Sequence, residues 1–144
     1  AIVESALVIP SKLTYAMIKP AFGSCYGLIR HKWFSKLQFK SLKIKQELFD
    51  DYYKDTCGIA KHNMIAFLQA NSLYSIKESI EKCTAKVKVF VGERENAAMK
   101  KSAQIINENL KSSSLRVMRK MYHGEFSINH ANDYVEEILA MVKA

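Results

Sequence analysis

Two short segments of the chain carry residue types that acid–base chemistry requires. Residues 92–95, Gly-Glu-Arg-Glu, follow the strand-like run KVKVFV, and residues 122–125, Tyr-His-Gly-Glu, follow a second alternating run, LRVMRKM. An imidazole can exchange a proton near neutral pH, and a neighbouring carboxylate can fix its tautomer and stabilise its protonated form. The sequence therefore predicts a pair between His123 and a nearby glutamate, which would be two members of a nucleophile–histidine–acid triad.

This pair can form only if the two runs are neighbouring strands of one parallel sheet. A helix is predicted between them, because Asn96 is a good N-cap residue and Met99, Ala103 and Ile106 recur at helical spacing. A strand, a helix and a second strand form the unit that builds parallel sheets with right-handed crossovers. The carboxyl ends of parallel strands meet at one edge of the sheet, where ligands bind. We therefore expect the two segments to lie side by side at that edge.

The rest of the chain predicts a third strand and a helical insertion. Residues 1–9 are short, apolar and β-branched, and Pro10 stops them, which indicates a buried parallel strand. Helices are predicted over residues 26–37, 44–57, 62–70, 75–82 and, at the end of the chain, about 132–143, with breaks at Pro20 and at Gly23 and Gly27. We expect an α/β protein with about three parallel strands and flanking helices. Residues 1–9 and 84–144 would form the core, and residues 10–83 a helical cap.

The segments VKVFVGERENAAMKKSAQIINENL and LRVMRKMYHGEFSINHANDYVEEILAMV resemble the C-terminal part of the α/β-hydrolase superfamily. In that family the penultimate strand ends in Gly-x-x-acid, and a His-Gly follows the last strand. Residues 1–9 resemble the strand after the nucleophile helix, and the cap is matched only by its position and helical character. The resemblance implies His123 as the catalytic base and Glu95 as its acid. Because the family more often has Asp there, Glu93 and Glu125 remain alternative acids.

The nucleophile of that family is not found in these residues. Its G-x-S-x-G elbow does not occur, and we expect it in a segment preceding Ala1. The motif Gly23-Ser24-Cys25-Tyr26-Gly27 has the form G-x-C-x-G, but Pro20 stands where a central strand would need a backbone donor, so we favour a cap loop. The resemblance implies a serine hydrolase acting on an ester, amide or similar small acyl substrate, with this chain inactive alone. A non-catalytic relative of the family is the alternative.

A formal net charge of +8 suggests a different class of function. Six basic residues and no acid lie between Arg30 and Lys45, interleaved with Trp33, Phe34 and Phe39, as in some nucleic-acid-binding surfaces. We favour a solvated helix face over a buried aromatic stripe. A basic helical module that binds nucleic acid remains the competing hypothesis.

Other features limit cofactors, location and assembly. No metal-ligand spacing or phosphate-binding glycine loop occurs, and His31, His62 and His130 are expected to be surface, core or loop residues. Three cysteines cannot all pair within the chain, and no apolar run is long enough to span a membrane, so we expect reduced thiols and a cytoplasmic location. An exposed edge along residues 2–9 predicts a homodimer, formed through this strand or by exchange of cap helices.

Overall fold

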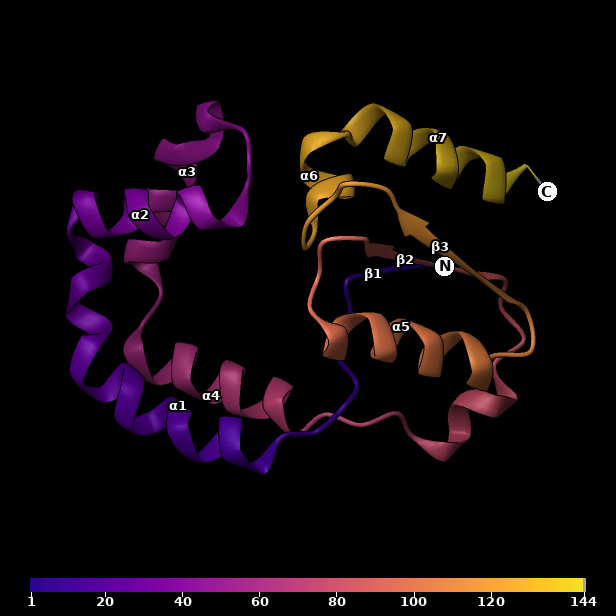
Figure 1. Ribbon diagram of the computed structural model, residues 1–144, viewed down its shortest axis with the longest axis horizontal. Coiled ribbons are helices and arrows are strands. Elements are labelled where there is room, and N and C mark those ends of the chain that lie inside the picture. The colour runs from indigo at the N-terminus through magenta and orange to yellow at the C-terminus, as the bar shows by residue number, and fades with distance from the viewer. Residues whose placement is uncertain (144) are drawn as a thin grey trace. The chain divides into compact units, whose positions relative to one another are not determined.

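The computed structural model of the protein describes residues 1–143, which form two compact units (Figure 1). The first unit contains Ala1–Val8 and the chain from Ser75 onward, and the second unit contains Ile9–Tyr74. Ala144, the last residue of the predicted core range, lies outside the described residues.

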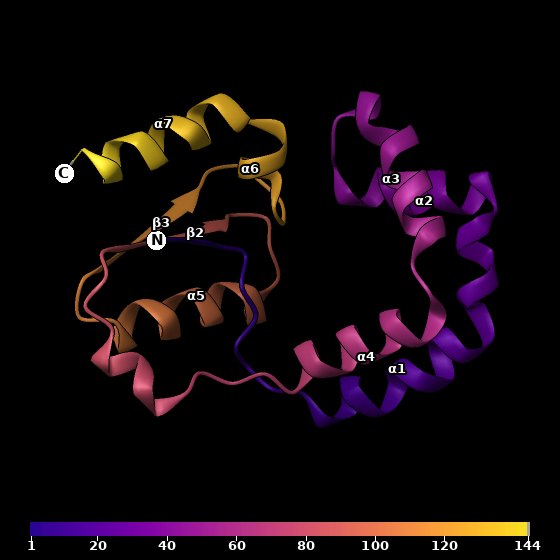
Figure 2. The same ribbon diagram turned by 180° about the vertical axis from the view of Figure 1, so that it is seen from behind.

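A three-stranded parallel sheet lies at the centre of the first unit, as predicted. Its strands are β1 (Ile2–Glu4), β2 (Val87–Gly92) and β3 (Ser113–Met118), in the order β1-β2-β3. All three strands end on the side of the sheet near α6 (Glu125–Asn129), as Figure 2 shows. The loops that follow the strands therefore meet at one edge.

Two strand boundaries differ from the predicted ones. The first strand ends at Glu4 rather than Ile9, because Ser5 adopts a left-handed backbone with φ of 52° and turns the chain out of the ladder. The third strand runs from Ser113 to Met118, whereas the predicted run was Leu115–Met121. Lys120 is also left-handed, with φ of 60°, and this conformation cannot continue a strand.

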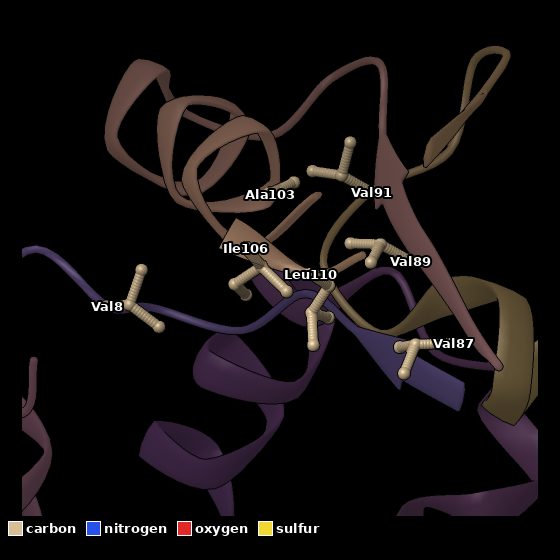
Figure 3. Packing of buried hydrophobic residues seen from close by; sticks show 7 residues of the cluster. All are labelled: Val8, Val87, Val89, Val91, Ala103, Ile106 and Leu110. Atoms are coloured by element: carbon tan, nitrogen blue, oxygen red, sulfur yellow. The ribbon is translucent and has the colours of Figure 1, made fainter. Parts of the chain in front are cut away.

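Helices cover both faces of the sheet, since successive residues of β2 point to opposite sides. Val87, Val89 and Val91 pack against α5 (Ala97–Asn109), whose buried residues Ala103 and Ile106 complete this core (Figure 3). On the other face, Phe90 packs edge-on against Phe126 of α6, and Phe126 against Tyr134 of α7 (Ala131–Val142). The helices predicted after Asn96 and near the C-terminus are confirmed, and the short α6 is an additional helix that was not predicted.

The second unit is helical, with α1 (Lys12–Cys25), α2 (Lys32–Leu42), α3 (Phe49–Gly58) and α4 (Lys61–Ser72). The predicted break at Pro20 and Gly23 is wrong, because α1 runs through both residues. Tertiary packing, in which Ile18 is buried, overrides the local cost of proline here. The predicted helix over residues 26–37 is instead a 3₁₀ turn, Tyr26–Arg30, followed by α2.

Residues 75–83, assigned to the cap from the sequence, belong to the first unit. They contain only a 3₁₀ turn, Glu78–Lys82, in place of the predicted helix. Ile76, Ile80 and Cys83 pack against the core formed by β2 and α5, which explains why this segment associates with the sheet. Among residues 1–143, no helix combines the length and apolar character that crossing a bilayer would require.

Candidate histidine–carboxylate site

The loops after β2 and β3 bring His123 and Glu95 into contact. Nδ1 of His123 lies 2.9 Å from Oε2 of Glu95, a hydrogen-bonding distance between two residues that are 28 positions apart. The side chain of Glu95 is only 1% exposed, whereas that of His123 is 59% exposed. With Nδ1 directed at the carboxylate, the imidazole can exchange a proton through its other nitrogen, Nε2.

The buried carboxylate of Glu95 is held by further donors. Its Oε1 accepts hydrogen bonds from the backbone N–H of Gly92 and from the hydroxyl of Ser5, both at 2.7 Å. Burying a carboxylate costs free energy unless it is hydrogen-bonded, and here both oxygens have partners. The carboxylate is therefore fixed in orientation, with Oε2 left for His123.

Hydrogen bonds join the residues that follow β2 to the end of β3 and the loop after it. The N–H of Glu93 donates to the carbonyl of Met118 at 2.9 Å, and the N–H of Arg94 donates to that of Met121 at 3.0 Å. A Cβ atom at position 92 would overlap the carbonyl oxygen of Met121, so only glycine allows this approach. The same contacts hold His123 beside Glu95.

The carboxylates of the other two candidate acids bind the backbone of the loop that carries His123. Oε2 of Glu93 accepts the N–H of Lys120 at 2.7 Å, and Oε2 of Glu125 accepts the N–H of Tyr122 at 2.7 Å. Of the three glutamates left open by the sequence, Glu95 is the one that the fold places against the imidazole.

Sequence reasoning missed two residues that support the site, Ser5 and Glu4. The carboxylate of Glu4 accepts the N–H of Phe126 at 3.1 Å and that of Ser127 at 3.2 Å, which satisfies two free donors at the start of α6. Both residues lie within residues 1–9, which the sequence predicted to be a single buried strand. The only signal was the pair of polar residues, Glu4 and Ser5, within that run.

The remaining candidate residues lie elsewhere. Cys25 is the last residue of α1, so a helix rather than a strand leads into its glycine-flanked motif, and the elbow geometry is not formed. His31 precedes α2, His62 lies in α4, and His130 separates α6 from α7. Within residues 1–143, no three His, Cys, Asp or Glu side chains gather in a way that could hold a metal ion.

The basic stretch has partners within its own unit. Nζ of Lys32 lies 5.5 Å from the ring centre of Tyr53, and Nζ of Lys36 lies 5.8 Å from that of Phe49. These are cation–π distances. The ring of Phe49 also packs on the buried Phe39. Of the aromatic residues interleaved with the basic ones, Phe39 is buried, whereas Trp33 is 63% exposed.

Comparison with known proteins connects this geometry to a fold. No family model matches the sequence, and no curated protein sequence matches it either. The structure is similar to an esterase from Exiguobacterium antarcticum (TM-score 0.74, 15% identity) and a bromoperoxidase from Bacillus anthracis (TM-score 0.75, 12% identity). It also resembles an alpha/beta hydrolase enzyme from a deep-sea metagenome library (TM-score 0.70, 9% identity).

The matched lengths are unequal. Each comparison covers 99% of this chain but only 55–57% of the solved chain, so this chain spans little more than half of the length of those proteins. The similarities confirm the predicted partial α/β-hydrolase fold. At these identities they establish the fold alone, because one fold supports many activities.

Proposed function

We propose that this chain, which has the fold of the C-terminal part of an α/β-hydrolase, supplies the histidine and the acid of a serine hydrolase. The observation that carries the proposal is the 2.9 Å contact between Nδ1 of His123 and the buried carboxylate of Glu95, at the carboxyl ends of two parallel strands. Ligands of open parallel sheets bind at such ends.

In the proposed reaction, Nε2 of His123 takes the proton of a serine hydroxyl as the serine attacks an acyl carbon. The proton then passes to the leaving alcohol or amine, and an acyl-serine remains. Water attacks this ester, again giving a proton to Nε2, and the acid product leaves as the serine is regenerated. Glu95 keeps the proton on Nδ1 in the neutral ring and stabilises the imidazolium that forms in each half-reaction.

We propose that the attacking serine lies outside residues 1–143. The hydroxyl of Ser5 touches the pair, but it donates to Glu95 and accepts the N–H of Gly124. We place the serine in a G-x-S-x-G elbow on a strand that would pair with the free side of β1. We propose that the helical unit, Ile9–Tyr74, is the cap that the sequence predicted.

Active-site labelling of the complete gene product tests this proposal. A fluorophosphonate probe reacts with a serine that a histidine activates, and mass spectrometry locates the modified residue. We expect one labelled serine, within a G-x-S-x-G motif upstream of the position that corresponds to Ala1. The change His123→Gln should slow labelling by at least about 10³-fold. Finding no such upstream motif, or equal labelling rates in both proteins, would contradict the proposal.

The fold also supports a proposal about assembly of the 144-residue chain. β1 is an edge strand, and α7 carries an apolar stripe, Val135, Ile138, Leu139 and Val142, that is 40–79% exposed. Open strand edges and apolar stripes favour association. We propose that two copies associate through these features. Light scattering coupled to size-exclusion chromatography should give twice the 16.4 kDa chain mass at micromolar concentration, whereas a stable monomer would rule out the dimer.

A cytoplasmic location is a further part of the proposal. It is supported by Cys25, Cys57 and Cys83, none of which forms a disulfide within residues 1–143. Free thiols are typical of reducing compartments. Fractionation of the source cells, with the chain found only outside the cytoplasm, would contradict it.

A further inference from the structure

We infer that Ser5 is a positioning residue that sets the orientation of Glu95 and of the His123 loop together. This inference rests on the proposed function, because it concerns the same histidine–carboxylate pair. The serine lies 90 positions before Glu95 and 119 positions before Gly124, yet it contacts both. It connects the ends of all three strands.

The hydroxyl of Ser5 acts as both a hydrogen-bond donor and an acceptor. It donates to Oε1 of Glu95 at 2.7 Å and accepts the backbone N–H of Gly124 at 3.0 Å. A hydroxyl is one of the few side-chain groups that can donate and accept through a single atom. The carboxylate of Glu95 and the backbone next to His123 are therefore both bound to the same atom, Oγ of Ser5.

The backbone of Ser5 is held in the conformation that this contact requires. Its φ of 52° lies in the left-handed region, which residues other than glycine seldom occupy, and its N–H donates to the carbonyl of Phe90 at 3.0 Å. Unusual backbone conformations persist where surrounding contacts enforce them, and they are concentrated at functional sites. Here the turn places the hydroxyl between the loops that follow β2 and β3.

Loss of the hydroxyl would free both of its partners. Oε1 of Glu95 would keep only the N–H of Gly92, so the carboxylate could rotate away from His123. The N–H of Gly124 would lose the acceptor that fixes the residue next to the histidine. The contact between Nδ1 and Oε2 should loosen, and the proton of the neutral ring should no longer be confined to Nδ1.

Nitrogen NMR of the histidines in the 144-residue chain tests this inference, because ¹⁵N shifts report which ring nitrogen carries the proton. In the unmodified chain we expect the neutral ring of His123 to be mainly the Nδ1–H tautomer. The change Ser5→Gly removes the hydroxyl and suits a left-handed backbone. It should reduce by at least half the amount by which the Nδ1–H tautomer of His123 outnumbers the Nε2–H tautomer. Ser5→Ala should also lower the population of the Nδ1–H tautomer, and it replaces Ser5→Gly in the experiment if the glycine variant does not fold.

Two further variants make the outcome specific. Ser41→Ala removes a hydroxyl that donates to the carbonyl of Gln38 in α2, and it should leave the His123 signals unchanged. Glu95→Gln should abolish the Nδ1–H preference. If Glu95→Gln abolishes it but neither Ser5 variant changes it, Ser5 does not position the pair and the proposed function stands. If Glu95→Gln has no effect, the pair itself is absent and both proposals fail.

Discussion

The carbonyl oxygen of Met121 lies so close to Gly92 that it would overlap the Cβ atom of any other residue at position 92. Gly92 ends β2 and Met121 belongs to the loop after β3, so this contact brings together the two segments that carry Glu95 and His123. The carbonyl oxygen of Tyr122 would be only 2.8 Å from the same Cβ. A backbone approach of this kind cannot be relieved by rotating a side chain.

The change Gly92→Ala should therefore destabilise the first unit. We expect the free energy of unfolding to fall by about 1–3 kcal/mol, the usual cost of overpacking, and the loop with His123 to shift away from β2. Urea denaturation measures the loss. Gly23→Ala is the matched control, since Gly23 lies in α1 with no atom within 4 Å of the added Cβ, and it should leave stability equal or higher. Equal effects of the two changes would contradict the close approach.

Glu4 should stabilise the start of α6 and influence Tyr134. Burial raises the pKa of Tyr134 above its usual 10.0, and the negative charge of Glu4 raises it further. We expect Glu4→Gln to lower this pKa part of the way, because burial is the larger cause. Titration followed by NMR of the tyrosine rings measures the shift. A Tyr134 pKa that does not change would show that Glu4 does not face this side of the sheet.

Glu137 of α7 should make stability depend on pH. A hydrogen bond from Lys88 holds its pKa below the usual 4.5, with Arg116 contributing, and the two pairs have N···O distances of 2.5 and 2.6 Å. A lowered pKa means that the ionised group stabilises the fold above pH 4.5 and that this contribution disappears as the pH falls through the lower, folded-state value.

The matching variant is Glu137→Gln. At pH 7 it should lower the free energy of unfolding by about 1 kcal/mol or less, because the pairs are partly exposed and screened by solvent. The difference in free energy of unfolding between Glu137→Gln and the unmodified protein should become smaller as the pH falls below 4.5. Added salt should also reduce this difference at pH 7. Denaturation curves at several pH values provide the measurement. A difference that stays constant from pH 7 to pH 3 would contradict the ion pairs.

The sheet of the first unit could be predicted because its residues follow simple periods. Val87, Val89 and Val91 alternate with Lys88 and Phe90, and the structure puts the three valines on the α5 face, as period two requires. The loop positions of Glu95 and His123 follow from the strand ends. These features depend on neighbours in the sequence, which is why the pattern revealed them.

The features that escaped prediction depend on distant contacts. The turn at Ser5 breaks an apolar run because Ser5 bonds to Phe90, Glu95 and Gly124, all more than 80 positions away. Likewise, α1 continues through Pro20 where a local rule predicts a break. By contrast, the family's Gly-x-x-acid spacing had already implied Glu95 rather than Glu93 as the acid, and the structure places Glu95 against His123.

The most direct measurement of the central claim is a comparison of ester hydrolysis by the complete protein and its glutamate variants. Each variant keeps the size of the side chain and removes one carboxylate: Glu95→Gln at the imidazole, and Glu93→Gln, whose carboxylate accepts the N–H of Lys120, as the control. We predict that kcat/KM for p-nitrophenyl acetate falls by about 10²–10⁴-fold in Glu95→Gln and by less than about tenfold in Glu93→Gln. Equal losses in the two variants, or full activity in Glu95→Gln, would contradict the pairing of His123 with Glu95 in catalysis.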